Sequence, residues 1–212
     1  MKRSVILIAG FLIALTPPAL AQDGSFVFQQ TPQPVSALQF QDESGAPHSL
    51  KEFRGKTILL NIWATWCLPC RKEMPTLDKL QAELGGDKFQ VVALSIDVAG
   101  PNAVRKFFAE FNIRNLALYI DQTNRSAADL GVVGLPTTLL INENGQELGR
   151  LVGPAEWDSP EMRDLLQKYI GARSGSRSGI DPVATAIRVR GRAVRSDVPS
   201  ALMLETSCKM EM

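Results

Sequence analysis

The sequence predicts an α/β domain in which a central sheet is flanked by helices. Two kinds of segment alternate along the chain. Runs of consecutive apolar residues are typical of buried strands, and runs with an apolar residue every three or four positions are typical of helices. Residues 57–63 and 89–97 are the clearest strands, and residues 71–84 form the clearest helix. A chain of 212 residues, 45% of them hydrophobic, is long enough for one such domain with a sizeable core.

The first 21 residues have the three-part layout of a secretory signal peptide. Lys2-Arg3 is basic, residues 5–15 are apolar, and Ala19-Leu20-Ala21 supplies the small residues of a cleavage site. The apolar run is shorter than the roughly 20 residues that a membrane span requires, and Pro17-Pro18 breaks it before the small residues. We therefore expect cleavage, with an uncleaved N-terminal membrane anchor as the alternative. Either outcome places the protein outside the cytoplasm.

The sequence patterns near the N-terminus are less distinct. Residues 22–35 are polar and contain two prolines, so they are predicted to be a linker. Residues 37–41 and 48–50, separated by a turn, predict a hairpin of two short strands. His48 is the only histidine. Since it lies beside Pro47 and away from the cysteines, we expect it in a solvated loop.

From residue 57 onward, strands and helices alternate. The strand at 57–63 leads into the helix at 71–84, whose apolar face comprises positions 74, 77, 80 and 84 and whose end is marked by Gly85-Gly86. The elements expected after it are a strand at 89–97, a helix from Pro101 to Phe111, a strand at 116–120, a short helix at 125–130, a hairpin with strands at 139–142 and 147–152, and a helix from Ser159 to Gly171. These elements place the folded domain at residues 36–172.

The charge is spread unevenly. Residues 22–172 carry 14 Lys and Arg against 18 Asp and Glu, a balance of −4, whereas residues 173–212 carry 7 against 4, a balance of +3. A mildly acidic domain gives no reason to expect nucleic acid as a partner. No core residues accompany the basic segment 173–212, so it is predicted to be a disordered tail, and Cys208 within it a thiol without a catalytic role.

Two cysteines lie at the junction between the strand 57–63 and the helix that follows, in the stretch Trp66-Cys67-Leu68-Pro69-Cys70. Cys67 falls where the unpaired N–H groups and the positive dipole end of the helix point. Both favour the thiolate, which is the nucleophilic form. Cys70 lies three residues on, on the same helical face, and can close a disulfide with Cys67. One thiol can attack a partner disulfide while the second resolves the mixed disulfide.

A structural disulfide and half of a zinc site are the alternatives. Zinc would require two further Cys or His ligands, and the chain offers only His48 and Cys208. The arrangement strand, CxxC, helix therefore favours a redox-active pair, with no metal and no organic cofactor.

Two stretches resemble the thioredoxin superfamily, and more narrowly the TlpA-like thiol-disulfide oxidoreductases, which are periplasmic or membrane-anchored. The first is the stretch 63–75, from Trp63-Ala64-Thr65-Trp66 through the cysteines to Pro75, and the second, Val133 to Asn142, resembles the cis-proline segment of the family. The resemblance covers residues 35–171. It implies a thioredoxin-like three-layer fold with a central mixed sheet, in which residues 89–115 correspond to the TlpA-like βα insertion.

The resemblance also implies roles for residues around the dithiol. Cys67 would attack the substrate disulfide and Cys70 would resolve the intermediate. Trp66 would belong to an exposed apolar surface on which substrates dock. The Leu135–Pro136 bond would be cis, with its loop packed against the cysteines and the backbone before Pro136 pairing with the substrate chain. These residues are the expected substrate-binding site.

Glu73 is the expected proton acceptor for Cys70. Thioredoxin itself has a buried aspartate six residues before its first cysteine, and here that position is Asn61, which cannot serve as a base. The TlpA-like reductases place an acid at the position of Glu73, where burial would raise its pKa. Trp63 and Trp157 are expected to be packing residues, and Arg71 and Lys72 to be solvated.

Together these observations predict a periplasmic protein-disulfide reductase. By resemblance, its substrates would be disulfide-containing exported proteins, in cytochrome c maturation or respiratory oxidase biogenesis, and a membrane dithiol would supply the electrons. A disulfide-introducing oxidase would use the same cysteines in the opposite direction. A metal-binding chaperone could hold a soft metal through the same CxxC pair. A peroxiredoxin is disfavoured, because it would use a peroxidatic cysteine and no CxxC.

Overall fold

A computed structural model describes residues 25–171 of the chain. Its elements are the strands β1 (Val27–Pro34), β2 (Gln39–Asp42), β3 (Pro47–Ser49), β4 (Thr57–Trp63), β5 (Phe89–Ser95), β6 (Tyr119–Ile120), β7 (Thr137–Ile141) and β8 (Gln146–Val152), the helices α1 (Leu68–Leu84), α2 (Pro101–Glu110), α3 (Arg125–Asp129) and α4 (Pro160–Gln167), and the 3-10 helix η1 (Leu50–Phe53). Every strand and helix predicted from the sequence is present, and β1 and η1 are additions.

The strands form one mixed sheet in the order β1-β8-β7-β4-β5-β6-β2-β3. The central strand β4 pairs in parallel with β5 and antiparallel with β7, so that Leu60 lies between Val92 and Leu139. All seven residues of β4 are buried. A strand buried on both faces explains the continuous apolar run in the sequence.

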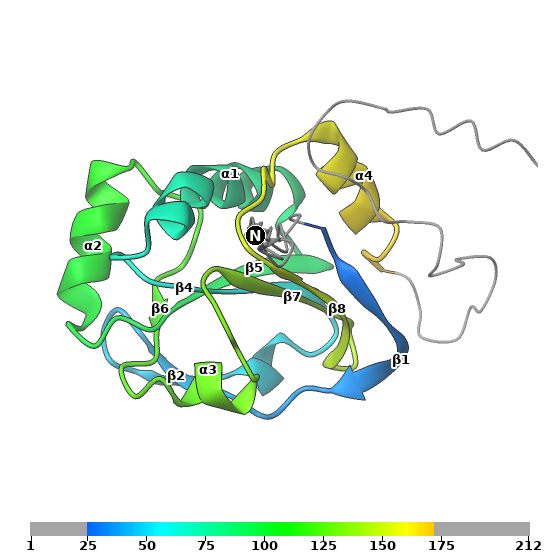
Figure 1. The fold of residues 1–212 in the computed structure, drawn as a ribbon, viewed down its shortest axis with the longest axis horizontal. Coiled ribbons are helices and arrows are strands. Elements are labelled where there is room, and N and C mark those ends of the chain that lie inside the picture. The colour runs from blue at the N-terminus through cyan, green and yellow to red at the C-terminus, as the bar shows by residue number, and fades with distance from the viewer. Residues whose placement is uncertain (1–24, 172–212) are drawn as a thin grey trace, which may run out of the picture.

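Helices cover both faces of the sheet, which gives the three layers. Figure 1 shows α1, α2 and α4 on one face and α3 on the other. Alternate residues of β4 enter different cores: Leu59 and Trp63 join the cluster under α1, α2 and α4, whereas Leu60 joins the cluster on the side of α3. Between α1 and β6, β5 and α2 form the predicted βα unit. The thioredoxin-like fold predicted from the sequence is therefore confirmed.

The prediction of a linker at residues 22–35 is wrong for residues 27–34. Residues 27–34 form β1, an edge strand antiparallel to β8, with Val27 opposite Arg150. Phe28 stacks on Tyr169, with ring centroids 5.4 Å apart. The polar composition that suggested a linker is that of an edge strand with most of its surface in water, where proline is also tolerated.

His48 is not in a solvated loop. It lies on β3, half-buried, with its ring stacked 6.3 Å from that of Phe40. Its Nδ1 is 2.8 Å from Glu52 Oε2 and its Nε2 is 3.3 Å from Asp42 Oδ2. The prediction of a hairpin was correct, but adjacent Pro47 did not keep the imidazole in solvent, because β2 and η1 both supply a carboxylate to it.

The predicted signal peptide at 1–21 and the predicted tail at 173–212, with Cys208, lie outside the described residues. The domain starts earlier than the predicted residue 36, because β1 belongs to the sheet. Within residues 25–171, the longest helix is too short and too polar to cross a membrane.

Candidate active site

The two cysteines occupy the turn from β4 into α1. They form a disulfide with 5.3 Å between the Cα atoms. Cys67 is the N-cap residue of α1, and its Sγ accepts a hydrogen bond from the backbone N–H of Cys70 at 3.3 Å. Cys67 is 6% exposed, whereas Cys70 is fully buried. When the disulfide is reduced, the same N–H groups and helix dipole favour a thiolate at Cys67.

Asp97 anchors the loop that precedes the dithiol. This buried carboxylate follows β5 and accepts hydrogen bonds from the backbone N–H of Thr65 at 2.9 Å and from its hydroxyl at 2.6 Å. The hydroxyl of Ser95 also donates to it at 2.7 Å. Sequence reasoning missed this role. The one available signal was an acidic residue at the end of an otherwise apolar strand.

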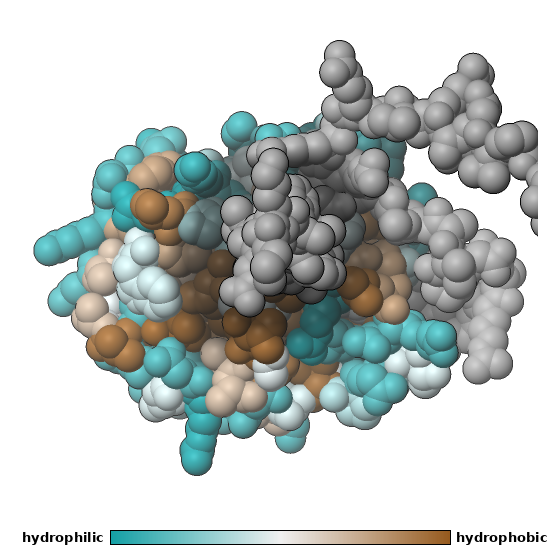
Figure 2. Space-filling view, viewed as in Figure 1, coloured by the Kyte–Doolittle hydropathy of each residue, from teal (hydrophilic) through white to brown (hydrophobic). Residues whose placement is uncertain are grey.

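Exposed apolar side chains surround this end of the sheet. Trp66 is 66% exposed and Leu68 is 70% exposed. Val133 is exposed in the loop between α3 and β7, and Val98 in the loop after β5. Apolar residues gather at the centre of the face drawn in Figure 2, over the loop between α3 and β7. The predicted exposure of Trp66 is thus confirmed, and its role in docking stays a prediction.

The Leu135–Pro136 bond is cis, as the resemblance implied. Pro136 directly precedes β7, whose Thr137 is opposite Ile62 of β4. This register places the proline loop beside the end of β4 that leads to the dithiol. Leu135 is half-buried and packs against the cluster that contains Cys67 and Cys70. The structure therefore places the predicted substrate-binding loop at the same end of the sheet as the cysteines.

Glu73 is buried one turn after Cys70, with 2% of its surface exposed. Its Oε1 accepts from Asn61 Nδ2 at 2.8 Å. Its Oε2 accepts from the backbone N–H of Ala155 and from Trp157 Nε1, both at 3.0 Å. Burial raises the pKa of Glu73 to about 7, against the hydrogen bonds from Trp157, Ala155 and Asn61, which lower it. The carboxyl group can therefore gain or lose a proton near neutral pH.

Three partners of Glu73 were not identified as such from the sequence. Trp157 was predicted only as a packing residue, and it is fully buried, but its indole N–H also binds Glu73. Asn61 was noted as a missing base, yet its amide joins Glu73 to Thr138 Oγ1 at 2.9 Å. The Oδ1 atom of Asn61 is buried without a partner. Trp157 is 84 residues away from Glu73, so no local pattern announces this contact.

Arg71 is not the solvated side chain that the sequence suggested. It is half-buried, and its guanidinium lies 5.1 Å from the ring centroid of Phe107 and 4.9 Å from that of Phe111. It donates to the carbonyl of Thr65 at 3.2 Å and to Glu110 at 3.3 Å. Its environment comes from α2, which packs beside the start of α1. Lys72, in contrast, is exposed as predicted.

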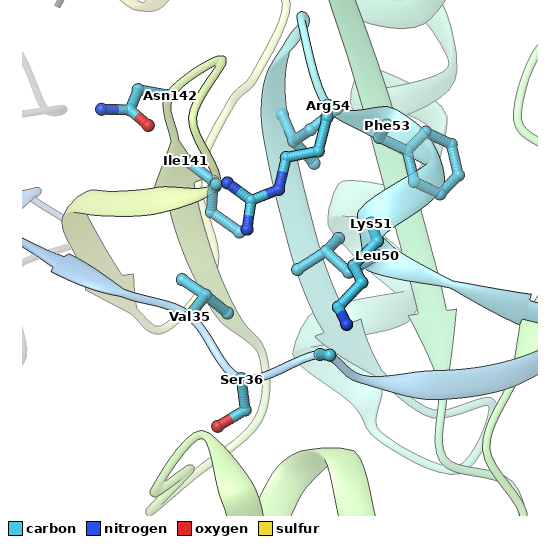
Figure 3. Close-up of a pocket in the computed structure, with 11 residues that line it drawn as sticks. Val35, Ser36, Leu50, Lys51, Phe53, Arg54, Ile141 and Asn142 are labelled. Carbon is cyan, nitrogen blue, oxygen red and sulfur yellow. The ribbon is translucent and has the colours of Figure 1, made fainter.

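A pocket elsewhere on the domain has no part in this site. It is lined by Leu50, Arg54, Ile58, Ile141 and neighbouring residues, at the end of β4 opposite the dithiol, and Figure 3 shows the Arg54 side chain extending toward Ile141. Its volume of about 10 Å³ is enough for a single water. Within the described part of the chain, no group of three or more Cys, His, Asp or Glu side chains is placed to hold a metal ion.

Comparison with known sequences agrees with this geometry. Residues 29–166 match the profile of the family described as Redoxin. The thioredoxin-like protein YneN of Bacillus subtilis is 41% identical over 104 residues, which are 48% of this chain and 59% of YneN. The thiol-disulfide oxidoreductase ResA of Bacillus thuringiensis subsp. konkukian is 32% identical over 127 residues, which are 60% of this chain and 71% of ResA. The chain thus spans less than two thirds of YneN.

Solved structures show the same fold. A putative thiol:disulfide interchange protein DsbE from Chlorobium tepidum superposes with a TM-score of 0.56 at 28% identity, over 66% of this chain and 95% of that one. A secreted thiol-disulfide isomerase from Corynebacterium glutamicum has a TM-score of 0.57 at 19% identity, over 74% of this chain and 94% of that one. At 19% identity, the second comparison bears on the fold alone.

Proposed function

The chain belongs to the Redoxin family, among the TlpA-like thiol-disulfide oxidoreductases of the thioredoxin superfamily, and from this premise we propose that it reduces disulfides in exported proteins through Cys67 and Cys70. The observation that carries the proposal is the buried carboxyl group of Glu73, one helical turn after the buried resolving thiol. A base at that position serves the second half of a disulfide reduction, in which a buried thiol must lose its proton.

The reaction starts from the reduced protein. The Cys67 thiolate attacks one sulfur of the substrate disulfide, a Cys67–substrate disulfide forms, and the second substrate sulfur leaves as a thiolate. The S–H bond of Cys70 then breaks, and its proton passes to Glu73. The Cys70 thiolate attacks Cys67 Sγ, which closes the Cys67–Cys70 disulfide and releases the first substrate sulfur. The substrate gains two electrons from the protein. A membrane dithiol donor then supplies two electrons that reduce the Cys67–Cys70 disulfide again.

The substrate-binding residues proposed here are Trp66, Leu135 and Pro136. Trp66 offers an apolar surface beside Cys67. The backbone around Leu135 and Pro136 lies at the same end of the sheet and would pair with the substrate chain. An extended or unfolded segment fits this arrangement, because it can pass between an exposed indole and a loop without a deep pocket.

We place the protein outside the cytoplasm, in the periplasm. The signal-peptide layout of residues 1–21 supports this location, as does the likeness to a putative thiol:disulfide interchange protein DsbE. If residues 1–21 are retained, they would tether the domain to the membrane. Within this compartment, a role in cytochrome c maturation or respiratory oxidase biogenesis agrees with a reductant whose substrates carry cysteine pairs.

Single-turnover reduction of insulin by the fully reduced protein tests the proposal. We expect the wild type to reduce insulin, Cys67→Ser to be inactive, and Cys70→Ser to accumulate a mixed disulfide on Cys67. Cys208→Ser is the matched control and should behave as the wild type. Activity that survives Cys67→Ser would contradict the assignment. A measured reduction potential as oxidising as that of DsbA, about −120 mV, would favour the oxidase direction instead.

A further inference from the structure

The carboxylate of Glu73 is surrounded by hydrogen-bond donors. Asn61 reaches it from β4, while Ala155 and Trp157 reach it from the segment between β8 and α4. All three partners donate, and none is charged. This arrangement suits the ionised form. After Glu73 has taken up a proton, however, the carboxylic O–H itself needs an acceptor, and a buried O–H without one is costly.

Two of the three partners cannot become acceptors. The backbone N–H of Ala155 and the indole N–H of Trp157 are donors only. Both bind Oε2, so the proton is better placed on Oε1, which Asn61 faces. The amide of Asn61 is different, because it carries a donor, Nδ2, and an acceptor, Oδ1, on the same planar group.

The acceptor of this amide is unused. Asn61 is fully buried, and among the described residues its Oδ1 is the only buried side-chain acceptor that lacks a hydrogen-bond partner. Both hydrogens of Nδ2 are occupied, one by Glu73 Oε1 at 2.8 Å and the other by Thr138 Oγ1 at 2.9 Å. The hydroxyl of Thr138 can donate as well as accept. If the amide turns over, Thr138 can donate to Oδ1, and Glu73 can do so as well once it is protonated.

We propose that Asn61 is a positioning residue whose side-chain amide rotates by half a turn as Glu73 changes its protonation state. When Glu73 is ionised, Asn61 Nδ2 donates to Oε1, as in the structure. When Glu73 is protonated, Asn61 Oδ1 accepts the O–H of Glu73 and the hydroxyl of Thr138. The inference rests on the proposed function, in which Glu73 receives the proton of Cys70.

The exchange needs no movement of the backbone. Nδ2 and Oδ1 are nearly equal in size and trade places about the Cβ–Cγ bond, a torsion with low barriers. The contacts with Glu73 and Thr138 keep their heavy-atom positions while donor and acceptor reverse. Each state leaves one atom of the amide unpaired, Oδ1 in the first and Nδ2 in the second. Because Asn61 can bind either form of Glu73, it opposes protonation less than a fixed donor would, as suits a partner of a group that must both take and release a proton.

Solution NMR of the oxidised, isotope-labelled wild-type chain tests this directly. The Glu73 Cδ shift, followed from pH 5 to 9, should show one titration near neutral pH. Nuclear Overhauser contacts between the Nδ2 protons of Asn61 and the side chain of Thr138 should be present above the midpoint and lost below it. Contacts that persist on both sides of the midpoint would overturn the proposal, as would the absence of a Glu73 titration in this range.

Two variants provide an independent measurement. Trp157→Phe removes an indole N–H that can only donate and therefore stabilises only the ionised form of Glu73. The pKa of Glu73 should rise by about one unit in this variant. Asn61→Leu removes a side chain that, in our proposal, binds both ionised and protonated Glu73. The pKa of Glu73 should therefore rise by less than half as much as in Trp157→Phe. An equal rise in the two variants would identify Asn61 as a fixed donor and refute the rotation. If Asn61→Leu does not fold, the wild-type spectra alone decide.

These measurements use oxidised protein and involve no turnover. A failure of the amide rotation is thus distinguishable from a failure of the proposed function, which would appear as an inability of the reduced wild type to reduce insulin.

Discussion

At the scale of single residues, the burial of Glu73 costs stability at neutral pH and gives its carboxyl group the pKa that the proposed proton transfer needs. Its burial raises its pKa to about 7, so the group is ready to exchange protons under neutral conditions. Three donors keep the carboxylate satisfied inside the protein. A solvated glutamate would titrate near its ordinary 4.5 and would be a weaker base for a thiol.

The first prediction concerns the rate of resolution. Glu73→Gln should slow the release of substrate from the Cys67 mixed disulfide by roughly 10²-fold, the low end for loss of a general base. In the wild type, this rate should rise with pH through about 7, as Glu73 loses its proton, and the variant should lack this rise near pH 7. Stopped-flow single-turnover kinetics across pH measure both. Glu83→Gln, on the exposed face of the same helix, is the control, and a profile of Glu73→Gln superimposable on that of the wild type would exclude the role.

The second prediction concerns stability. Glu73 ionises at its ordinary 4.5 in the unfolded chain but only at about 7 in the folded protein, so between these values the unfolded state binds fewer protons. The stability contributed by neutral Glu73 is therefore present below pH 4.5 and is lost as the pH rises through 7. Relative to the wild type, Glu73→Gln should gain about 1–3 kcal/mol between pH 5 and pH 8.

Denaturant unfolding of the oxidised proteins at the two pH values measures this gain. The exposed variant Glu83→Gln should differ from the wild type by the same small amount at both. A difference for Glu73→Gln that does not change with pH would mean that Glu73 is already ionised in the folded protein at pH 5.

At this scale, the sequence revealed the reactive residues but not what surrounds them. Cys67 and Cys70 stand in a local motif whose spacing has a chemical meaning. Trp157 and Thr138 are 84 and 77 residues away in sequence from the residues that they contact. The residue type alone does not indicate which partner an indole or a hydroxyl will bind. The sequence showed that Asn61 stands where thioredoxin has an aspartate. It did not show that the Asn61 amide binds Glu73, because that contact depends on the packing of β4 against α1.

At the scale of secondary structure, the elements best predicted were those whose burial is uniform or strictly periodic. The strand β4, with all of its residues buried, and the helix α1, with its apolar face, agree closely with expectation. The strand β1 was missed because only part of one face is covered, so its sequence shows no alternation. The hairpin of β2 and β3 was found, but the interactions of His48 with both of its neighbours were not.

The third prediction concerns that hairpin. The hydrogen bond with Glu52 is the largest effect on the pKa of His48 and raises it; burial opposes this, and the hydrogen bond with Asp42 adds to the rise. A raised pKa means that the stabilisation by His48 is fully present below pH 6.5 and is lost as the pH rises through the folded-state pKa. His48→Gln should therefore lower the melting temperature at pH 5.5 and change it little at pH 8.5.

Calorimetric scans of wild type and variant at both pH values test this, with Glu52→Gln as a second variant that removes the larger partner. Glu52→Gln should produce a loss with the same pH dependence but a smaller size, because Asp42 still pairs with His48. Equal losses at both pH values would show that His48 acts only through the packing of its ring on Phe40.

At the scale of the whole molecule, the sheet determines where the chemistry lies. Because β4 and β5 are parallel, their carboxyl ends lie at the same end of the sheet, where the dithiol and Asp97 follow them. Because β7 is antiparallel to β4, its first residue and the preceding Pro136 lie at the same end of the sheet. This convergence follows from topology. It was accessible from the sequence only through resemblance to a known family, since local patterns do not specify which strands become neighbours.

The extent of the domain is the subject of the last prediction. Phe26 is buried against the ring of Trp157, with centroids 6.0 Å apart, and β1 covers the edge of β8. Removal of residues 1–34 should therefore destabilise the oxidised protein by about 3 kcal/mol or more, the usual cost of losing a buried phenylalanine. Removal of residues 1–24 should leave the stability unchanged, because it spares Phe26 and β1.

A third truncation, of residues 173–212, should also leave stability and insulin reduction near wild-type values. Leu165 and Leu166 of α4 belong to the buried cluster, and Tyr169 stacks on Phe28. In the sequence, no core residues accompany the basic segment 173–212, so we expect its removal to spare the core. Thermal and denaturant unfolding of the three truncated proteins, together with single-turnover activity, measure the contribution of each segment. Equal stability of the proteins lacking residues 1–24 and 1–34 would show that β1 is dispensable and that the domain begins near residue 36, as the sequence alone suggested.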